Sequence, residues 1–385
     1  MALLESIRAA RPLRKAGGIL HDASAPSLVE TLQITREYDA RVLQANIERW
    51  GGALVGLTPR TLLVPLTQAH AVLLLRAYES LEHAAEVVGA AAAGYTASGR
   101  TSAALVPEEA ALLEGLGPQI QRAIDALSTG EGGCFVKLSS RSPKDAAARS
   151  GVFDRHYVQA VHAERELDDE RRLWILCEAE GAALRFADAA AVVRALVLSE
   201  RVWQDMTLAL RHPESWEQNI VLRKWEAVPV DMEFRTFVSG GRITGISQYA
   251  YQLCSPRLND GAQLTLAIAA IRNVFDTLWP ILVNQEFSAC VLDFGVISPM
   301  DGEGKWGATL IEINPFEETT DGALFSWTRE RDVIEGKMEG VEYPVVRITE
   351  RKRTGALAMV PRGWKEVMAR VEKQLSSTDS SNLSA

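Results

Sequence analysis

The fold of this chain is decided by residues 287–316, which read FSACVLDFGVISPMDGEGKWGATLIEINPF. Two apolar runs flank a loop rich in glycine and charge, which predicts two antiparallel strands around a turn. With Gly302 at the centre of the turn, Asp293 and Glu312 are at about equal distances from it and are predicted to be cross-strand partners, roughly 5 Å apart at Cβ. Asn314 projects with Glu312, because residues two apart on a strand share a face.

These three polar side chains form a candidate metal site. Two carboxylates and an amide oxygen on neighbouring strands are an all-oxygen ligand set suited to Mg²⁺ that bridges phosphates. The residues around them are apolar: Val291, Leu292, Leu310, Ile311 and Ile313. Strands of this composition are buried on both faces, where a carboxylate without a cation is costly. The alternative is that the three side chains face solvent from a half-exposed sheet.

The order of elements predicts the α+β class, with helices first and an antiparallel sheet late. Helical periodicity dominates the first third of the chain, and strand signals dominate from Ile220 onward. Residues 1–30 are basic and broken by glycine and proline, so we expect an N-terminal extension there. Residues 366–385 are expected to be a disordered tail, which leaves one structured unit at 31–365.

Composition excludes several classes of protein. The chain has 385 residues, of which 47% are hydrophobic and 24% charged, and this argues against wholesale disorder. A formal net charge of -9 argues against non-specific coating of nucleic acid. The four cysteines are far apart, which disfavours a structural zinc site or a disulfide scaffold and fits a reduced, cytoplasmic setting. No uncharged apolar run reaches the ~18 residues of a membrane span.

A second candidate site begins at Lys137 in the strand-like run FVKLSS. A strand lysine can reach phosphate oxygens as a compact charge. The turn that follows starts with Ser139 and leads to Lys144 and Asp145, and it offers hydroxyls and N–H groups of the kind that surround phosphate. No Walker-type phosphate loop is present. The alternative is a solvated lysine at a sheet edge.

Two further strands carry polar candidates. Glu233 and Arg235 in MEFRTF share a strand face, and Leu222 with Arg223 in VLRKW offers a strand edge whose backbone can pair with an adenine ring. The alternatives are an exposed ion pair and an ordinary strand.

Several stretches, in this order, resemble the cell division cycle protein 123 family, a branch of the ATP-grasp superfamily. They read FVKLSSRSPKDA, VLRKWEAVPVDMEFRTFVSGGRITGISQ, LDFGV and LIEINPFEETTDGALFSW. The resemblance extends over residues 45–345, and Glu-x-Asn near its end is also the general ATP-grasp metal signature.

The resemblance implies an ATP-grasp fold, in which two lobes with mainly antiparallel sheets hold ATP and Mg²⁺ between them after a helical N-terminal portion. The lobe with Lys137 is expected at about 120–220 and the core lobe at about 221–350. It also implies an assembly factor, or chaperone, for the heterotrimeric eukaryotic translation initiation factor 2, acting through its gamma subunit. We accordingly expect a cytoplasmic monomer with a protein partner and a nucleotide, and without direct nucleic-acid or membrane binding.

Carried over residue by residue, the resemblance gives each candidate a role. Lys137 contacts phosphate, and Leu222 with Arg223 lies at the hinge near adenine. Glu233 and Arg235 line the phosphate site, while the metal is held by Asp293, Glu312 and Asn314.

The chain also departs from the family pattern. Ser139-Ser140-Arg141 stands where a tryptophan is usual, and Tyr249 stands where an arginine is expected. Residues 151–180 resemble an insertion, and Glu312 replaces the more frequent aspartate. We therefore expect a retained nucleotide site and a changed client. Two alternatives stay open: an ATP-grasp ligase that activates a carboxylate as an acyl phosphate, and a binding protein whose nucleotide site is a relic.

Overall fold

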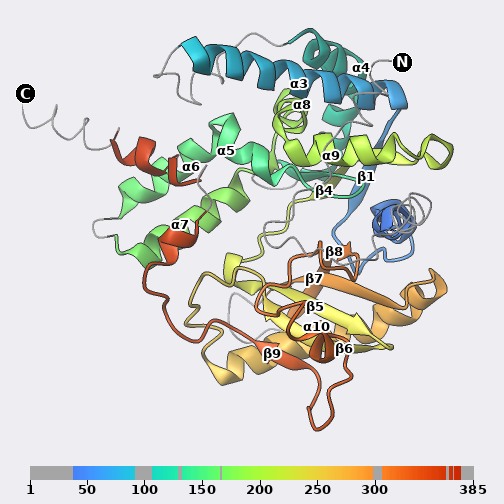
Figure 1. Ribbon diagram of the computed structural model, residues 1–385, viewed down its shortest axis with the longest axis vertical. Helices are drawn as coiled ribbons and strands as arrows, with labels where there is room; N and C mark the ends of the chain where they lie inside the picture. The colour runs from blue at the N-terminus through green and yellow to red at the C-terminus, as the bar shows by residue number, and fades with distance from the viewer. Residues whose placement is uncertain are drawn as a thin grey trace, which may run out of the picture.

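The structure is a computed structural model that describes residues 38–91, 106–128, 132–164, 167–297, 306–360, 364–366 and 368–373. Two sheets lie one above the other along the long axis of the molecule, with helices packed around each (Figure 1). The predicted α+β class with mainly antiparallel sheets is confirmed. The predicted extension at 1–30 lies outside the described residues.

The first lobe is built on a four-stranded sheet in the order β1-β4-β2-β3, and all of its pairs are antiparallel. Its strands are β1 (Thr61–Leu66), β4 (Gln218–Lys224), β2 (Cys134–Leu138) and β3 (Arg185–Phe186). One apolar core joins this sheet to the helices α3 (Gln68–Ala91), α4 (Pro107–Leu127), α8 (Ala189–Leu198) and α9 (Glu200–Ala209). The short helices η3 (Lys144–Ala146) and η4 (Pro213–Ser215) complete the lobe.

The second lobe is built on a five-stranded sheet in the order β8-β7-β5-β6-β9. Its strands are β8 (Gly307–Asn314), β7 (Ala289–Ile297), β5 (Glu233–Ser239), β6 (Arg242–Gln248) and β9 (Val345–Arg347), and only the β6–β9 pair is parallel. Helix α10 (Gly261–Asn284) packs on one face of the sheet, and α11 (Arg331–Ile334) contacts β5 and β6. The opposite face carries the polar candidates and looks toward the first lobe.

The hairpin that decided the prediction has the predicted register. Asp293 on β7 pairs directly with Glu312 on β8, and an irregularity follows, because Phe294 pairs with Leu310. The two carboxylates are thus cross-strand neighbours, as expected from their distances to the turn.

The division into lobes differs from the boundaries expected from the sequence. The strand β4 was expected to open the core lobe at 221, yet it lies in the first sheet between β1 and β2. The helices α3 and α4 and the strand β1 belong to the first lobe as well, so that lobe begins well before residue 120. Sheet partners at long sequence separation account for the difference, since β1 and β4 are more than 150 residues apart.

A helical subdomain lies beside the two lobes and consists of α5 (Ala147–Ser150), α6 (Val152–Ala163), α7 (Asp169–Ala182), η6 (Ala356–Met359) and the described part of residues 364–373. The predicted disordered tail from 366 is wrong at its start. Met368 and Val371 are buried against the subdomain, and Arg370 forms an ion pair with Asp154 at 2.6 Å. Apolar residues at 364, 368 and 371 follow helical spacing, which is why this segment packs. Residues 374–385 lie outside the described residues.

Residues 38–44 are helical, and η1 (Ile47–Arg49) follows after a turn. Residues 27–37 lie outside the described part. The segment 225–229 and η5 (Val230–Met232) connect the two sheets.

One described helix, α10, is long and apolar enough to cross a membrane by length and composition alone. Its buried residues, among them Ile271, Leu278 and Leu282, pack with the five-stranded sheet in one core. One face of α10 is therefore packed on the sheet.

Candidate functional site

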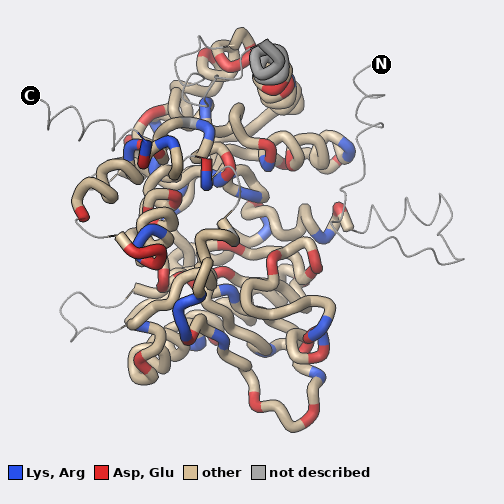
Figure 2. The backbone as a smooth tube through the Cα atoms, turned by 60° about the vertical axis from the view of Figure 1, so that its left-hand side comes forward, with Lys and Arg blue, Asp and Glu red and all other residues tan. Residues whose placement is uncertain are grey.

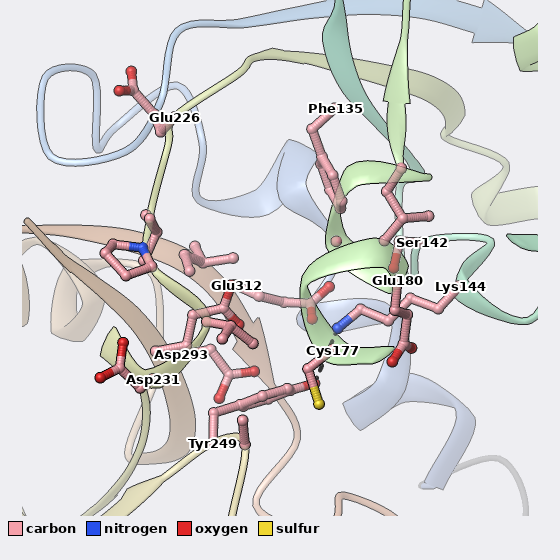
Figure 3. Close-up of a pocket in the computed structure, with 18 of the residues that line it drawn as sticks. Phe135, Ser142, Lys144, Cys177, Glu180, Glu226, Asp231, Tyr249, Asp293 and Glu312 are labelled. Carbon is pink, nitrogen blue, oxygen red and sulfur yellow. Dashed lines mark hydrogen bonds between the residues drawn. The ribbon is translucent and has the colours of Figure 1, made fainter. Parts of the chain in front are cut away.

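A cavity of about 700 Å³ lies between the two lobes. Its walls come from the first sheet, the second sheet, α7 and the connecting segment after β4 (Figure 3). Its size falls in the ~300–1,000 Å³ range of small-molecule sites. Seven predicted residues line it: Lys137, Lys144, Arg223, Glu233, Arg235, Asp293 and Glu312.

A row of charged side chains crosses the second sheet and forms one wall of the cavity. Arg235 on β5 pairs with Asp293 on β7, which in turn pairs with Glu312 on β8. The guanidinium of Arg235 donates to both oxygens of Asp293, at 2.9 Å to Oδ1 and 2.8 Å to Oδ2. A further bond joins Arg235 Nη1 to the carbonyl of Asp321 at 2.7 Å. Because both side chains are nearly buried, this bidentate pair is rigid and well defined.

Lys137 reaches the same row from the opposite lobe. It projects from β2, is 2% exposed, and forms an ion pair with Glu312 across the cavity. Burial alone raises the pKa of the Glu312 carboxyl, but attraction to Lys137, its hydrogen bond and the charge of Lys144 outweigh burial and hold the pKa below its ordinary value. Lys137 and Glu312 therefore link the two lobes through one ion pair, in which the lysine is buried and the carboxylate is partly exposed.

Lys144 enters the cavity from η3 and points toward Tyr249 (Figure 3). Its Nζ donates to the hydroxyl of Tyr249 at 3.2 Å. The oxygen of Tyr249 first, and then the carboxylates of Glu233 and Glu180, raise the pKa of Lys144 above its ordinary value despite burial. The lysine is thus charged at neutral pH.

Glu180 and Glu233 also line the cavity, and within the described parts of the chain neither forms an ion pair like those of Asp293 and Glu312. Burial raises the pKa of Glu233 and of Glu180, and the charge of Lys144 opposes the rise in both. Glu180 lies on α7, inside the stretch that resembled an insertion, so sequence reasoning missed it. Only one feature of the sequence indicated it: Glu180 lies close to Cys177 and Gly181, near the end of a helix whose first turn is charged.

Arg223 connects the first sheet to β8 rather than projecting freely. Its guanidinium donates to the carbonyl of Ile311, the carbonyl of Leu310 and the hydroxyl of Thr58. Burial lowers the pKa of Arg223 to about 10, which leaves it charged at neutral pH. The preceding Leu222 is fully buried in the core of the first lobe and is absent from the cavity lining among the described residues.

Ser139 and Asp145 lie behind the cavity wall and hold its framework. The hydroxyl of Ser139 accepts from the amide of Asn219 at 2.8 Å and donates to Glu48. The carboxylate of Asp145 accepts from the hydroxyl of Ser199 at 2.6 Å and lies at the start of α9. Neither lines the cavity among the described residues, so both belong to the framework behind it.

The three predicted metal ligands lie together, and the oxygen chemistry of this set fits Mg²⁺. Asn314 Nδ2 donates to Asp293 Oδ2 at 2.9 Å, and Glu312 is the strand neighbour of Asp293. In this structure both carboxylates form ion pairs within the chain: Asp293 with Arg235, and Glu312 with Lys137. Among the described residues no three His, Cys, Asp or Glu side chains form a ready-made metal cluster. The metal assignment stays a prediction.

In the view of Figure 2, basic and acidic residues are interspersed along both lobes. The site is therefore not marked by a surface on which one sign of charge predominates. What defines it is the meeting of two sheets that present charged side chains across a cavity, and this arrangement agrees with the predicted ATP-grasp fold.

Comparison with known proteins gives the family. The sequence pattern of D123 matches residues 173–365, which is just over half of the chain. The chain therefore belongs to the D123 family, in agreement with the resemblance to the cell division cycle protein 123 family. The match begins inside 151–180, so its residues 173–180, with Glu180 among them, are part of the family region.

Individual relatives agree with this family assignment. A translation initiation factor eIF2 assembly protein from Kluyveromyces lactis is 37% identical over 117 residues, which are 30% of this chain and 28% of the relative. A protein of the same name from Candida albicans is 25% identical over 245 residues, 60% of this chain and 58% of the relative. The matches thus span between about a quarter and three fifths of these relatives.

Solved structures support the fold. The structure of Cdc123 from Schizosaccharomyces pombe matches 81% of this chain and 98% of its own, with a TM-score of 0.52 and 21% sequence identity. The predicted ATP-grasp fold is thereby confirmed.

Proposed function

We propose that this chain is an ATP- and Mg²⁺-binding assembly factor whose client is eukaryotic translation initiation factor 2, through its gamma subunit, or a related protein. The names of its relatives support the assembly role. The cavity between the lobes supports the nucleotide.

The observation that carries the proposal is the convergence of cations and carboxylates in one cavity. Lys137, Lys144 and Arg235 supply positive charge for phosphates, as lysine and arginine do in other phosphate sites. Glu180, Glu233, Asp293 and Glu312 line the same space. A polyphosphate next to four carboxylates is repelled unless a divalent cation lies between them, so this wall favours the magnesium complex over the free nucleotide.

The residues of the cavity can be assigned to the metal, the phosphates and the base. Asp293, Glu312 and Asn314 would hold Mg²⁺, which neutralises phosphate charge when bound. Glu312 becomes available as Lys137 turns from the carboxylate to phosphate, since one ammonium serves either anion. Because Leu222 is buried, the base would contact the backbone after β4 rather than that side chain.

Nucleotide binding in this cavity changes how the two lobes are arranged relative to each other. Lys137 and Glu312 connect the two sheets, and so do Lys144 and Tyr249. A ligand that competes for these side chains favours one lobe arrangement over another. The ligand thereby favours one client-binding state, which is a shift of populations and requires no hydrolysis.

A thermal shift assay with Mg-ATP tests nucleotide binding. A ligand at 100 times its dissociation constant stabilises the folded state by about 2.7 kcal/mol. The matched control is Glu312→Gln, which keeps the shape and removes one ligand charge. An unchanged melting temperature of the wild-type protein with Mg-ATP contradicts the nucleotide assignment and favours the relic site.

Capture of the client tests the assembly role. The purified chain is expected to retain the gamma subunit of translation initiation factor 2 from a eukaryotic extract more strongly with Mg-ATP than with EDTA. Equal retention in both conditions, or none, counts against the proposal. For the full-length protein we propose a monomer in the cytoplasm, which light scattering and a fluorescent fusion check.

A ligase is the second candidate, and Glu180 and Glu233 favour it. Buried carboxylates with a raised pKa are suited to act as general bases for an attacking amine. ADP release that requires both an added carboxylic acid and an added amine would support a ligase. Release that is independent of both would not.

A further inference from the structure

Tyr249 lies between two cations that come from different lobes. It follows β6, and its amide donates to the carbonyl of Glu233 at 2.9 Å, which places it opposite Glu233 at the end of the sheet. The ammonium of Lys144 is 4.9 Å from the ring centroid, and the guanidinium carbon of Arg235 is also 4.9 Å from it. Both distances are within the reach of a cation–π contact.

The two cations differ in how they are held. Arg235 is fixed by two bonds to Asp293 and one to a carbonyl. Glu180 and Glu233 line the same cavity as Lys144, and their charges raise the pKa of the lysine. Yet no ion pair within 4.0 Å joins it to any carboxylate in the part of the chain that the structure describes, and its one hydrogen bond there is to Tyr249.

A lysine near two partly buried carboxylates would ordinarily pair with one of them, because a charged acceptor binds an ammonium more strongly than a hydroxyl does. The ring and hydroxyl of Tyr249 offer a neutral acceptor at a different place. A phosphate group displaces a phenol hydroxyl from an ammonium more easily than it breaks an established ion pair.

We propose that Tyr249 is a positioning residue that holds Lys144 away from Glu180 and Glu233 and thereby keeps its charge available for a phosphate group. The proposal deepens the proposed function and rests on it for the nature of the ligand. It also accounts for a departure in the sequence, since the resemblance leads one to expect an arginine at this position. Arginine has no acceptor and cannot hold a lysine in this way.

Titration calorimetry with Mg-ATP and Mg-ADP measures the effect. Tyr249→Phe keeps the ring and removes the acceptor, and it should weaken binding about three- to tenfold, the range expected for one lost hydrogen bond. Tyr343→Phe is the matched control and should change little, because it removes a tyrosine hydroxyl that accepts from the amide of Met338 and does not line the cavity.

A double-mutant cycle separates positioning from general damage. If Tyr249 acts through Lys144, then Tyr249→Phe should cost nothing further once Lys144→Met has been introduced. The variant that combines Tyr249→Phe with Glu180→Gln and Glu233→Gln should regain affinity relative to Tyr249→Phe, because Lys144 then has no carboxylate to pair with. An equal loss in the Lys144→Met background overturns the proposal.

A crystal structure of nucleotide-free Tyr249→Phe provides a readout that does not depend on ATP. We expect Lys144 Nζ to move to within ion-pair distance of Glu180 or Glu233. A lysine that stays in place overturns the proposal. Absence of calorimetric heat from the wild-type protein would instead count against the nucleotide site itself, and this crystal structure would still decide the role of Tyr249.

Discussion

The two walls of the cavity hold their charges differently. On the second sheet, the carboxylates of Asp293 and Glu312 are each paired with a cation, although Glu312 is 21% exposed, while Glu233 on β5 forms no ion pair among the described residues. On the wall formed by α7 and η3, Glu180 and Lys144 lie near one another without an ion pair. The difference indicates that the sheet wall stabilises the fold as well as binding a ligand, whereas the helical wall is free to respond to one.

The largest effect is expected from Arg235→Ala, which tests whether the sheet wall is structural. It leaves the carboxylate of Asp293 buried without its cation, and breaking a buried pair in this way costs about 3–5 kcal/mol. Denaturant unfolding should show the loss as a lower midpoint with an unchanged slope.

Two variants control that measurement. Arg331→Ala removes a pair with Glu335 in which the arginine is 45% exposed, and it should cost less than about 1 kcal/mol. The double variant of Arg235→Ala with Asp293→Asn should recover part of the stability, because no charge is left without a partner. If Arg235→Ala and Arg331→Ala behaved alike, the sheet wall would have no structural role.

Lys137→Met tests the pair that connects the two lobes. At neutral pH Glu312 would remain charged without its partner, with an expected loss of about 1–3 kcal/mol. The pKa of Glu312 lies below its ordinary value in the folded protein, so the pair contributes stability above the unfolded pKa and loses it as the pH falls through the folded pKa.

The pH dependence gives the check. Unfolding of wild-type protein and Lys137→Met is compared at neutral pH and at the lowest pH at which both still fold. The difference in the free energy of unfolding should shrink toward acid, because Glu312 becomes protonated in both. A difference that is constant with pH would mean that packing of the lysine chain, and not its charge, accounts for the loss.

Gly295→Ala tests how closely the connection between the lobes packs on the sheet wall. A Cβ at this position would lie 2.7 Å from Cγ2 of Val228 and 3.2 Å from Cδ1 of Ile311. Overpacking of this kind costs about 1–3 kcal/mol. Gly307→Ala, on β8, meets no atom within 4 Å and is the matched control. Equal melting temperatures of the two variants would contradict the close packing.

The same contrast between walls explains what the sequence could predict. The sheet wall follows from short-range patterns, since apolar runs around a turn determine both the register of Asp293 with Glu312 and the face that Glu233 and Arg235 share. Both features depend on neighbours along one strand or across one hairpin, which strand periodicity encodes. The pairing of Arg235 on β5 with Asp293 on β7 is of longer range and was not predicted.

The helical wall could not be predicted in this way. Glu180 reaches the cavity because α7 packs on α6 and on the C-terminal segment with Met368 and Val371, which lie some 190 residues further along the chain. The predicted lobe boundary was wrong for the same reason, since β1 and β4 pair although they are far apart in the sequence. Contacts of this range leave no periodic trace in a single sequence.

The smallest effect is expected from Glu180→Gln on the helical wall. Burial raises the pKa of Glu180, so its charged form opposes folding, and the wild-type protein loses stability as the pH rises from the unfolded pKa through the folded one. The glutamine variant lacks this decline and should equal or exceed the wild type at neutral pH, by no more than about 0.5 kcal/mol. Urea unfolding between mildly acidic and neutral pH measures it. A clear loss of stability at neutral pH would show that Glu180 is bound as firmly as Asp293, and the two walls would then no longer differ in kind.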